Sequence, residues 1–250
     1  MRLLHLDIET SPNLGYIWGL WKQNIGLAQL VESTEILCWV AKWHGEDELM
    51  FKSLGNTTKE DMIATMWKLL DEADAVCHYN GVRFDIPHLN REFLDHGLAP
   101  PSSYKQIDLL QAVKKQFRYP SNKLEYVAKQ LGIGQKVKHI GFELWTRCMA
   151  NDQEAWDMME VYNRQDVVLL EELYNKLVPW IPNHPNFNLY VDNNKVACTK
   201  CGSGNYRRQG YAYTGVSKFQ QYRCKDCGSW YRGRKNLAER GDMPTAISGI

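Results

Sequence analysis

Two acidic residues near the N-terminus have the types and spacing of metal ligands. The segment Leu3 to Thr10 reads LLHLDIET, in which apolar and polar residues alternate. This alternation predicts a strand with one buried apolar face, so Asp7 and Glu9 project together from the other face. Two such carboxylates repel each other unless a cation lies between them. A partly exposed strand with two solvated acids is the alternative, and the rest of the chain must decide.

Further acids occur where a fold could bring them to this strand. Asp85 follows a short apolar run, Ala75 to Tyr79, which predicts a buried strand followed by a turn at Gly81. Tyr162 and Asp166 are four residues apart in a predicted long helix and therefore share one face. Alone, that pair would be an ordinary helix-surface tyrosine and aspartate.

The ordered set D-I-E, N-G-x-x-F-D and Y-x-x-x-D resembles the DEDD superfamily of 3′–5′ exonucleases, which has a ribonuclease-H-like fold. The tyrosine in the third motif is typical of one subclass. The second motif, NGVRFDIPHLN, is most similar to the proofreading exonuclease domains of family-B DNA polymerases. The resemblance covers roughly residues 1–177. Its four implied carboxylates are Asp7, Glu9, Asp85 and Asp166.

The resemblance also implies a role for each residue. Asp7 would bridge two metal ions, Glu9 and Asp166 would complete the site of the metal that activates water, and Asp85 would serve the second metal, often through water. Tyr162 would orient the attacking water, because an unperturbed phenol pKa of about 10 makes it a poor base at neutral pH. Two Mg²⁺ or Mn²⁺ ions about 4 Å apart suit this chemistry and prefer oxygen ligands.

Several other residues are candidates for substrate contact. By the resemblance, Asn80 would lie near the terminal nucleotide, and Phe84 matches a position that more often packs. Trp18 and Trp21 belong to the irregular segment Ser11 to Glu35 and could stack on a frayed base. The alternative for these tryptophans is a lid packed on the domain's own surface.

Four of the seven cysteines form two C-x-x-C pairs, each followed by glycine. The spacing predicts a structural zinc site of the zinc-ribbon type, with a closed shell of four thiolates and no catalytic role. The predicted ligands are Cys198, Cys201, Cys224 and Cys227. The other three, Cys38, Cys77 and Cys148, occur in apolar surroundings and are expected to be buried thiols.

Basic and aromatic residues are interleaved around the cysteine pairs. Such residues bind phosphates and bases, so Arg207, Arg208 and Lys218 are candidate nucleic-acid contacts. Docking of the ribbon on a protein partner, such as a polymerase, is the alternative.

The hydrophobic pattern predicts elements that can carry these residues. Further strands are expected near 36–43, 48–53 and 106–109, and helices near 59–72, 87–95, 111–117, 122–131, 142–150 and 153–177. Thr57 and Glu60 have the spacing of a capping box for the first of these helices. Asp108, in the last strand, is either a structural residue or a fifth acid near the metals. Strands followed by alternating strands and helices predict an α/β fold, a ribonuclease-H-like mixed sheet flanked by helices.

Composition and charge divide the chain further. We expect an exonuclease domain over 1–178, a proline-rich linker over 179–189, a zinc-ribbon β module over 190–235 and a loose tail over 236–250. From Asn193 onward the chain has 11 Lys and Arg against 3 Asp and Glu, a net charge of +8, while the remainder carries −7. This asymmetry favours a cation-binding body with a polyanion-binding module. No long apolar run or signal peptide is apparent, so a cytoplasmic protein is expected.

The sequence therefore predicts a two-metal 3′–5′ exonuclease with a role in DNA replication or repair. DNA is favoured over RNA as substrate, and a proofreader of this length would act with a separate polymerase. An endonuclease or ribonuclease on the same fold, or a catalytically silent nucleic-acid-binding replication protein, are the alternatives.

Overall fold

The computed structural model describes residues 1–190 and 196–238. The chain divides into two compact units, Arg2–Tyr174 and Asn175–Ile250, with Met1 grouped in the second. Each unit is described by itself. The domain limits expected from composition stay a prediction, and residues 239–250 of the expected tail lie outside the described residues.

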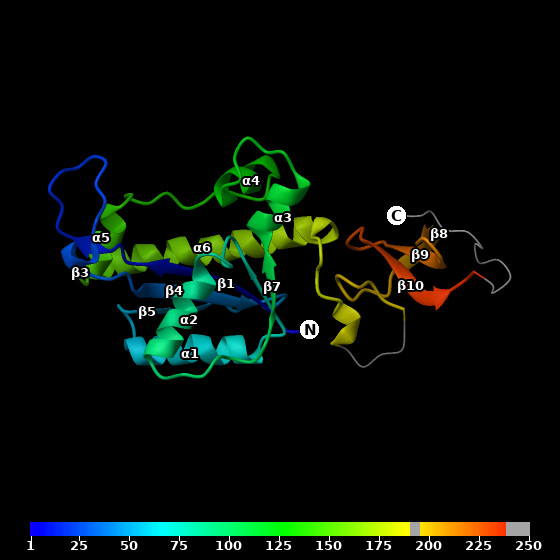
Figure 1. Cartoon of the computed structure of the whole chain (residues 1–250), viewed down its shortest axis with the longest axis horizontal. Coiled ribbons are helices and arrows are strands. Elements are labelled where there is room, and N and C mark those ends of the chain that lie inside the picture. The colour runs from blue at the N-terminus through cyan, green and yellow to red at the C-terminus, as the bar shows by residue number, and fades with distance from the viewer. Residues whose placement is uncertain (191–195, 239–250) are drawn as a thin grey trace. The chain divides into compact units, whose positions relative to one another are not determined.

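The first unit is built on a five-stranded mixed sheet (Figure 1). Its strands are β1 (Leu3–Thr10), β4 (Ile36–Trp43), β5 (Met50–Ser53), β6 (Ala75–His78) and β7 (Lys105–Asp108), in the order β5-β4-β1-β6-β7. β1 is central, antiparallel to β4 and parallel to β6. The predicted mixed α/β sheet is confirmed.

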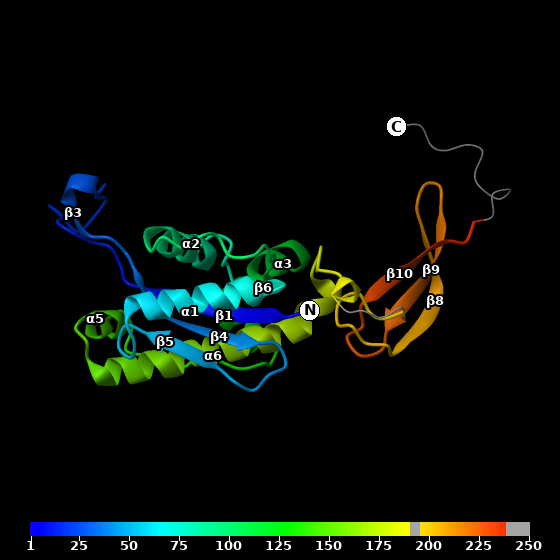
Figure 2. The same cartoon turned by 90° about the horizontal axis from the view of Figure 1, so that it is seen from below.

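Helices cover both faces of this sheet. They are α1 (Lys59–Glu72), α2 (Asp85–Asp95), α3 (Leu109–Gln116), α4 (Leu124–Gln130), α5 (Glu143–Met149) and α6 (Gln153–Leu177). α1 and α2 lie on one face of the sheet, while α5 and α6 lie on the other (Figure 2). In the described residues no helix has the length and apolar character needed to cross a membrane.

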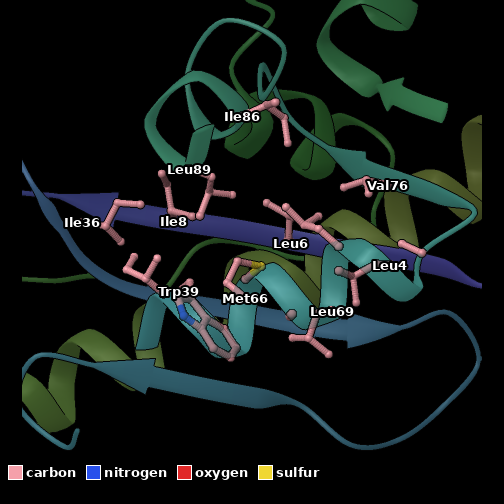
Figure 3. Close-up of a cluster of buried hydrophobic side chains, with 14 of the residues drawn as sticks. Leu4, Leu6, Ile8, Ile36, Trp39, Met66, Leu69, Val76, Ile86 and Leu89 are labelled. Carbon is pink, nitrogen blue, oxygen red and sulfur yellow. The ribbon is translucent and has the colours of Figure 1, made fainter. Parts of the chain in front are cut away.

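The alternation of β1 determines what each face of the sheet carries. Leu4, Leu6 and Ile8 are almost fully buried against α1 and α2, where they contact side chains such as Met66 and Leu89 (Figure 3). The odd-numbered residues of β1 therefore point toward the α5–α6 face.

The α5–α6 face has its own apolar core. Leu37 and Cys38 of β4 pack there against Leu144, Trp156 and Met159. As predicted, the cysteines outside the C-x-x-C pairs are buried; they are Cys38, Cys77 and Cys148.

Several local details differ from expectation. The N-cap of α1 is Thr58, whose side chain accepts from the Asp61 N–H, so the capping box predicted from Thr57 and Glu60 is wrong by one residue. Gly81 is needed for space, since a Cβ there would lie 2.3 Å from the His78 ring, and the left-handed residue of the turn is Asn80. β5 begins two residues later than expected.

The segment between β1 and β4 forms an exposed arm. It contains a two-stranded sheet of β2 (Leu14–Gly15) and β3 (Leu30–Glu32) and the short helix η1 (Leu27–Gln29). Trp18 and Trp21 are 96% and 83% exposed. The alternative of a lid packed on the domain surface is therefore wrong for both tryptophans.

The second unit contains a three-stranded antiparallel sheet in the order β10-β9-β8. Its strands are β8 (Tyr206–Tyr213), β9 (Lys218–Cys224) and β10 (Trp230–Asn236), preceded by the short helices η2 (Val178–Trp180) and η3 (Phe187–Leu189). Lys200 Nζ donates hydrogen bonds to the carbonyl oxygens of Pro179 and Ile181, which ties the cysteine region to the proline-rich segment.

Candidate active site

Three carboxylates from distant parts of the chain converge at the middle of the first unit. Asp7 and Glu9 come from β1 and Asp166 from α6, and one oxygen of each lies within 4.8 Å of the others. The spacing of the three donors suits oxygen coordination of one divalent cation.

The polar face of β1 is held against α6 by a buried amide. Asn163 Nδ2 donates to Asp7 Oδ2 at 2.7 Å. The Cys38 thiol donates to Asn163 Oδ1 at 3.8 Å. Asn163 is fully buried, so its amide fixes which oxygen of Asp7 faces the cluster.

Asp85 lies beside the cluster rather than within it. It is the first residue of α2 and accepts from the backbone N–H of Ile8 at 3.2 Å. Its carboxyl is 2% exposed and is close enough to raise the pKa of Asp7. The position suits an acid that serves a second ion through water more than one that shares the first.

Lys136 provides a cation at the cluster. Its ammonium donates to Asp166 Oδ2 and, at 3.1 Å, to the Tyr162 hydroxyl oxygen. Asp166 Oδ1 is buried and has no hydrogen-bond partner in the described residues. A buried carboxylate oxygen without a partner is costly, so a cation or a hydrogen-bond donor bound to it would stabilise the site.

Burial and mutual repulsion raise the pKa values of the acids. Desolvation is the largest cause for each, followed for Asp7 by the charges of Asp85, Glu9 and Asp166. The pKa of Glu9 rises to about 8 and that of Asp85 to about 7, and the pKa of Asp166 rises although Lys136 opposes the shift. Four acids that resist ionisation together fit a site completed by divalent cations.

Tyr162 lies at the edge of the cluster among aromatic rings. Its ring centroid is 4.8 Å from that of His139 and 6.1 Å from that of Trp145. Burial, and next the charge of Asp166, raise the pKa of the Tyr162 phenol. The hydroxyl therefore keeps its proton at neutral pH and can orient a water but not deprotonate it.

A cleft of about 570 Å³ opens onto these residues. Asp7 and Asp166 line it together with three lysines, Lys114, Lys123 and Lys136. Carboxylates beside cations in one cleft provide both metal ligands and contacts for a phosphate.

The other sequence candidates have different surroundings. Asn80 is partly buried in the turn before α2, and Phe84 is 37% exposed with its ring 4.8 Å from that of His88. Asp108 is the N-cap of α3 and also accepts from the Asn80 N–H at 3.0 Å, so its structural role is the one observed. Trp18 lies on the exposed arm, outside the cleft lining.

The four cysteines of the second unit form one cluster. Their sulfur atoms lie within 4.8 Å of one another, with Cys198 and Cys227 3.6 Å apart and Cys201 and Cys224 3.7 Å apart. A tetrahedron with Zn–S bonds of about 2.3 Å has edges of about 3.8 Å, whereas a disulfide requires about 2.05 Å. The cluster therefore has the dimensions of a four-thiolate metal site.

The predicted basic contacts of this unit are at its surface. Arg207 and Arg208 are exposed on β8, and Lys218 lies over the Tyr211 ring at 4.1 Å from its centroid.

Sequence reasoning missed three residues of the site. Lys136 is in an irregular segment between α4 and α5, Trp145 is on the short helix α5, and Asn163 is between the two motif residues of α6. No periodicity or motif marks them. The signal that was available is that Asn163 precedes Asp166 by three residues and so lies on the same helix face.

The sheet order and the acidic cluster on its central strand define a ribonuclease-H-like domain. A model of the RNase H superfamily matches residues 4–178, and the chain belongs to this superfamily. Membership of this superfamily supports a nuclease activity that uses divalent metal ions.

Comparison with solved structures agrees on the fold. The chain is similar to the family B DNA polymerase from the hyperthermophilic archaeon Pyrobaculum calidifontis, with a TM-score of 0.52 and 18% sequence identity. The match covers 71% of this chain and 24% of the polymerase, so the chain spans only a small part of that enzyme. No curated protein matches the chain in sequence.

Proposed function

We propose that this chain is a metal-dependent 3′–5′ exonuclease that hydrolyses DNA at single strands or frayed 3′ ends and releases nucleoside 5′-monophosphates. The observation that carries the proposal is the convergence of Asp7, Glu9 and Asp166. Tyr162 lies beside them, because the Lys136 ammonium donates both to its hydroxyl oxygen and to Asp166. Membership of the RNase H superfamily and the fold shared with a family B DNA polymerase support it.

The acids would hold two Mg²⁺ or Mn²⁺ ions. Asp7, Glu9 and Asp166 supply oxygen donors for the first ion, and Asp85 is near enough to serve the second. When bound, such ions lower the pKa of water and stabilise the leaving oxyanion. Lys136 contacts Asp166 in the structure, so an ion bound to the same oxygen of Asp166 would replace this contact.

The chain's own groups orient the reactants. Asn163 holds Asp7 in place, and the protonated Tyr162 hydroxyl positions water against the phosphate. Lys114 and Lys123 line the same cleft and can contact the phosphates upstream of the scissile bond. Asn80 and Phe84 would contact the terminal nucleotide, and Trp18 would stack on a frayed base.

The cysteine cluster would hold one structural zinc ion and so order the second unit. A unit of this size scarcely folds without such a cross-link. Arg207, Arg208 and Lys218 would then help to bind nucleic acid or a separate polymerase or replication protein.

Product length from end-labelled DNA tests the proposal. A 5′-labelled single strand should give a ladder that shortens stepwise in Mg²⁺ or Mn²⁺ and stays intact in EDTA. Asp7→Ala should abolish this ladder, whereas Asp47→Ala, an exposed acid outside the cluster, should not. Internal cuts would indicate an endonuclease, preferential digestion of RNA a ribonuclease, and binding without cleavage a silent binding protein.

A further inference from the structure

The strand register of the second unit divides its side chains between two faces. Directly paired residues in a sheet project to the same side, and residues alternate along each strand. Tyr206 pairs with Cys224, and Tyr222 pairs with Tyr231. These tyrosines contact one another, with Tyr222 and Tyr231 stacked at 5.4 Å, so this face holds the cysteines and the unit's aromatic core.

The opposite face carries arginines and exposed rings. Arg223 of β9 is directly opposite Arg207 of β8 and Trp230 of β10, which makes one row across all three strands. The neighbouring row contains Gln221 and Arg232, and Phe219 follows. We call this surface the arginine face; its members are Arg207, Phe219, Gln221, Arg223, Trp230 and Arg232.

Stacking on this face leaves the guanidinium groups available. Arg232 lies over the Phe219 ring at 3.9 Å from its centroid, and Arg223 lies over the Trp230 ring at 5.6 Å. Arg207, Arg223 and Arg232 are all exposed. Within residues 1–190 and 196–238 no carboxylate forms an ion pair with these arginines. Stacking holds the flexible side chains in place while their N–H groups remain free to bind an anion.

The arrangement has an electrostatic cost that an anion would remove. Like charges directly opposite each other in an antiparallel pair are destabilising, and Arg207 faces Arg223 in this way. The ring of Trp230 is 46% exposed beside them. A chain of phosphates with attached bases matches both features, since phosphates bind the guanidinium groups and bases stack on the ring.

We propose that the arginine face is a binding platform for single-stranded nucleic acid. This inference deepens the proposed function, because it assigns the second unit a surface that holds the strand. An unpaired strand is favoured over a duplex, because the exposed ring can stack only on a base that is not already stacked between its neighbours. Of the three predicted basic contacts, Arg207 belongs to this face, whereas Arg208 pairs with Tyr222 and projects with the other set.

A binding experiment on the full chain tests the platform. A fluorescent thymidine 20-mer is titrated with zinc-loaded protein, without added Mg²⁺ or Mn²⁺, at several salt concentrations. The double variant Arg223→Gln, Arg232→Gln should bind at least about tenfold more weakly. Its slope of log affinity against log salt should fall by about 1.4, as expected for two lost phosphate contacts on a single strand.

A matched control removes the same charge elsewhere. Lys68→Gln, Lys225→Gln takes two exposed lysines outside the face and should change affinity less than twofold. Trp230→Ala should weaken binding about tenfold with an unchanged salt slope, because stacking releases no counterions. Equal zinc content in all variants shows that the unit is folded.

Three results would overturn the platform. They are equal losses in the two double variants, duplex DNA bound as tightly as the single strand, and competition by poly-glutamate at the same charge concentration as the oligonucleotide. Because no hydrolysis occurs in this assay, failure of the platform leaves the nuclease proposal standing. Loss of nuclease activity in a separate assay would likewise leave the binding result unaffected.

Discussion

The acidic cluster and the cysteine cluster are both sets of metal-ligand residues, but they are assembled in opposite ways. The cysteines span Cys198 to Cys227 and lie in one small unit. Asp7 is near the start of the first unit's sequence and Asp166 is near its end. Their carboxylates meet only because α6 packs across β1. The local cluster can be predicted from spacing alone, whereas the distant one requires the fold.

The two clusters also differ in what they leave open. Four thiolates complete a tetrahedral shell, so the cysteine site has no position for substrate. Three carboxylates beside a cleft leave coordination positions for water and phosphate. The cysteine site is thus suited to stabilising structure, whereas the acidic site is suited to acting on a substrate.

Removing an acid should remove activity without removing structure. Asp166→Asn keeps the side-chain volume but removes a buried carboxylate. The pKa of this carboxyl is raised, chiefly by burial. We expect hydrolysis to fall at least about 10³-fold, on the scale of losing a principal catalytic group. Thermal unfolding of the first unit should change little. Activity close to wild type would contradict the assignment of the acidic cluster.

Removing two thiolates should remove the structure of the second unit. Cys198→Ser, Cys227→Ser should abolish zinc binding and unfold the second unit, because we propose that the metal cross-links this unit. Cys148→Ser, a buried cysteine outside the cluster, should keep one zinc per chain. Zinc content and limited proteolysis measure both effects. A double variant that retained zinc would show that the thiolates are not its ligands.

Lys136 should affect both the reaction rate with Mg²⁺ and the stability of the metal-free protein. Lys136→Met removes the ammonium that contacts Asp166 and Tyr162. We expect the rate with Mg²⁺ to fall about 10²-fold, as for loss of a preorganised donor. The metal-free protein should also be less stable, since Asp166 loses its buried partner. Lys138→Met, in the same segment, provides the control. Equal rates for the two variants would exclude a role for Lys136 in the reaction.

Tyr162→Phe should have a smaller effect on turnover. Loss of an orienting hydroxyl should lower kcat about tenfold and leave KM within about twofold. The acid limb of the pH–rate profile should not move, because a phenol with a raised pKa does not titrate there. Matching losses in kcat and in substrate affinity would argue for a binding role instead.

A buried acid with cationic partners provides the contrast to the cluster. Burial raises the pKa of Glu92, but hydrogen bonds from Arg91 and Lys59 outweigh it and hold the pKa below its usual value. Because the folded pKa is depressed, the stabilisation is present above the unfolded pKa of about 4.3 and is lost as pH falls through the folded value.

Glu92→Gln should therefore lower the free energy of unfolding at pH 7 by about 2 kcal/mol. The loss should shrink as the pH falls through the folded pKa of Glu92, for example at pH 3, because the wild-type carboxyl then loses its charge too. Glu72→Gln, an exposed partner of Arg2, should cost under about 0.5 kcal/mol. Denaturant unfolding at both pH values measures this, and a loss independent of pH would show that packing, not charge, is responsible.

Strong periodicity made much of the fold predictable. The bounds of α1 and α6 agree with the sequence pattern, because each helix buries a long apolar stripe. The cap of α1 was misplaced because Thr57 and Thr58 are adjacent and equally suited to capping. Propensity cannot choose between neighbours whose packing decides the outcome.

The site was predictable only where a motif or strand face marked it. Asp7 and Glu9 follow from alternation in β1, but Lys136 and Asn163 acquire their roles through tertiary contacts that no local pattern encodes. The arm tryptophans show the same limit, because exposure depends on the surface that is available to cover them.

The central claim is that Asp7, Glu9 and Asp166 hold the metal ions of a 3′-end nuclease. The most direct measurement is a time course on single-stranded DNA labelled at the 5′ end, with Mn²⁺ or Mg²⁺, for the wild type and for Asp166→Asn. The account predicts a ladder that shortens one nucleotide at a time from the 3′ end, dependent on the metal and absent in the variant. A ladder that persists in Asp166→Asn, or products cut internally from the outset, would contradict it.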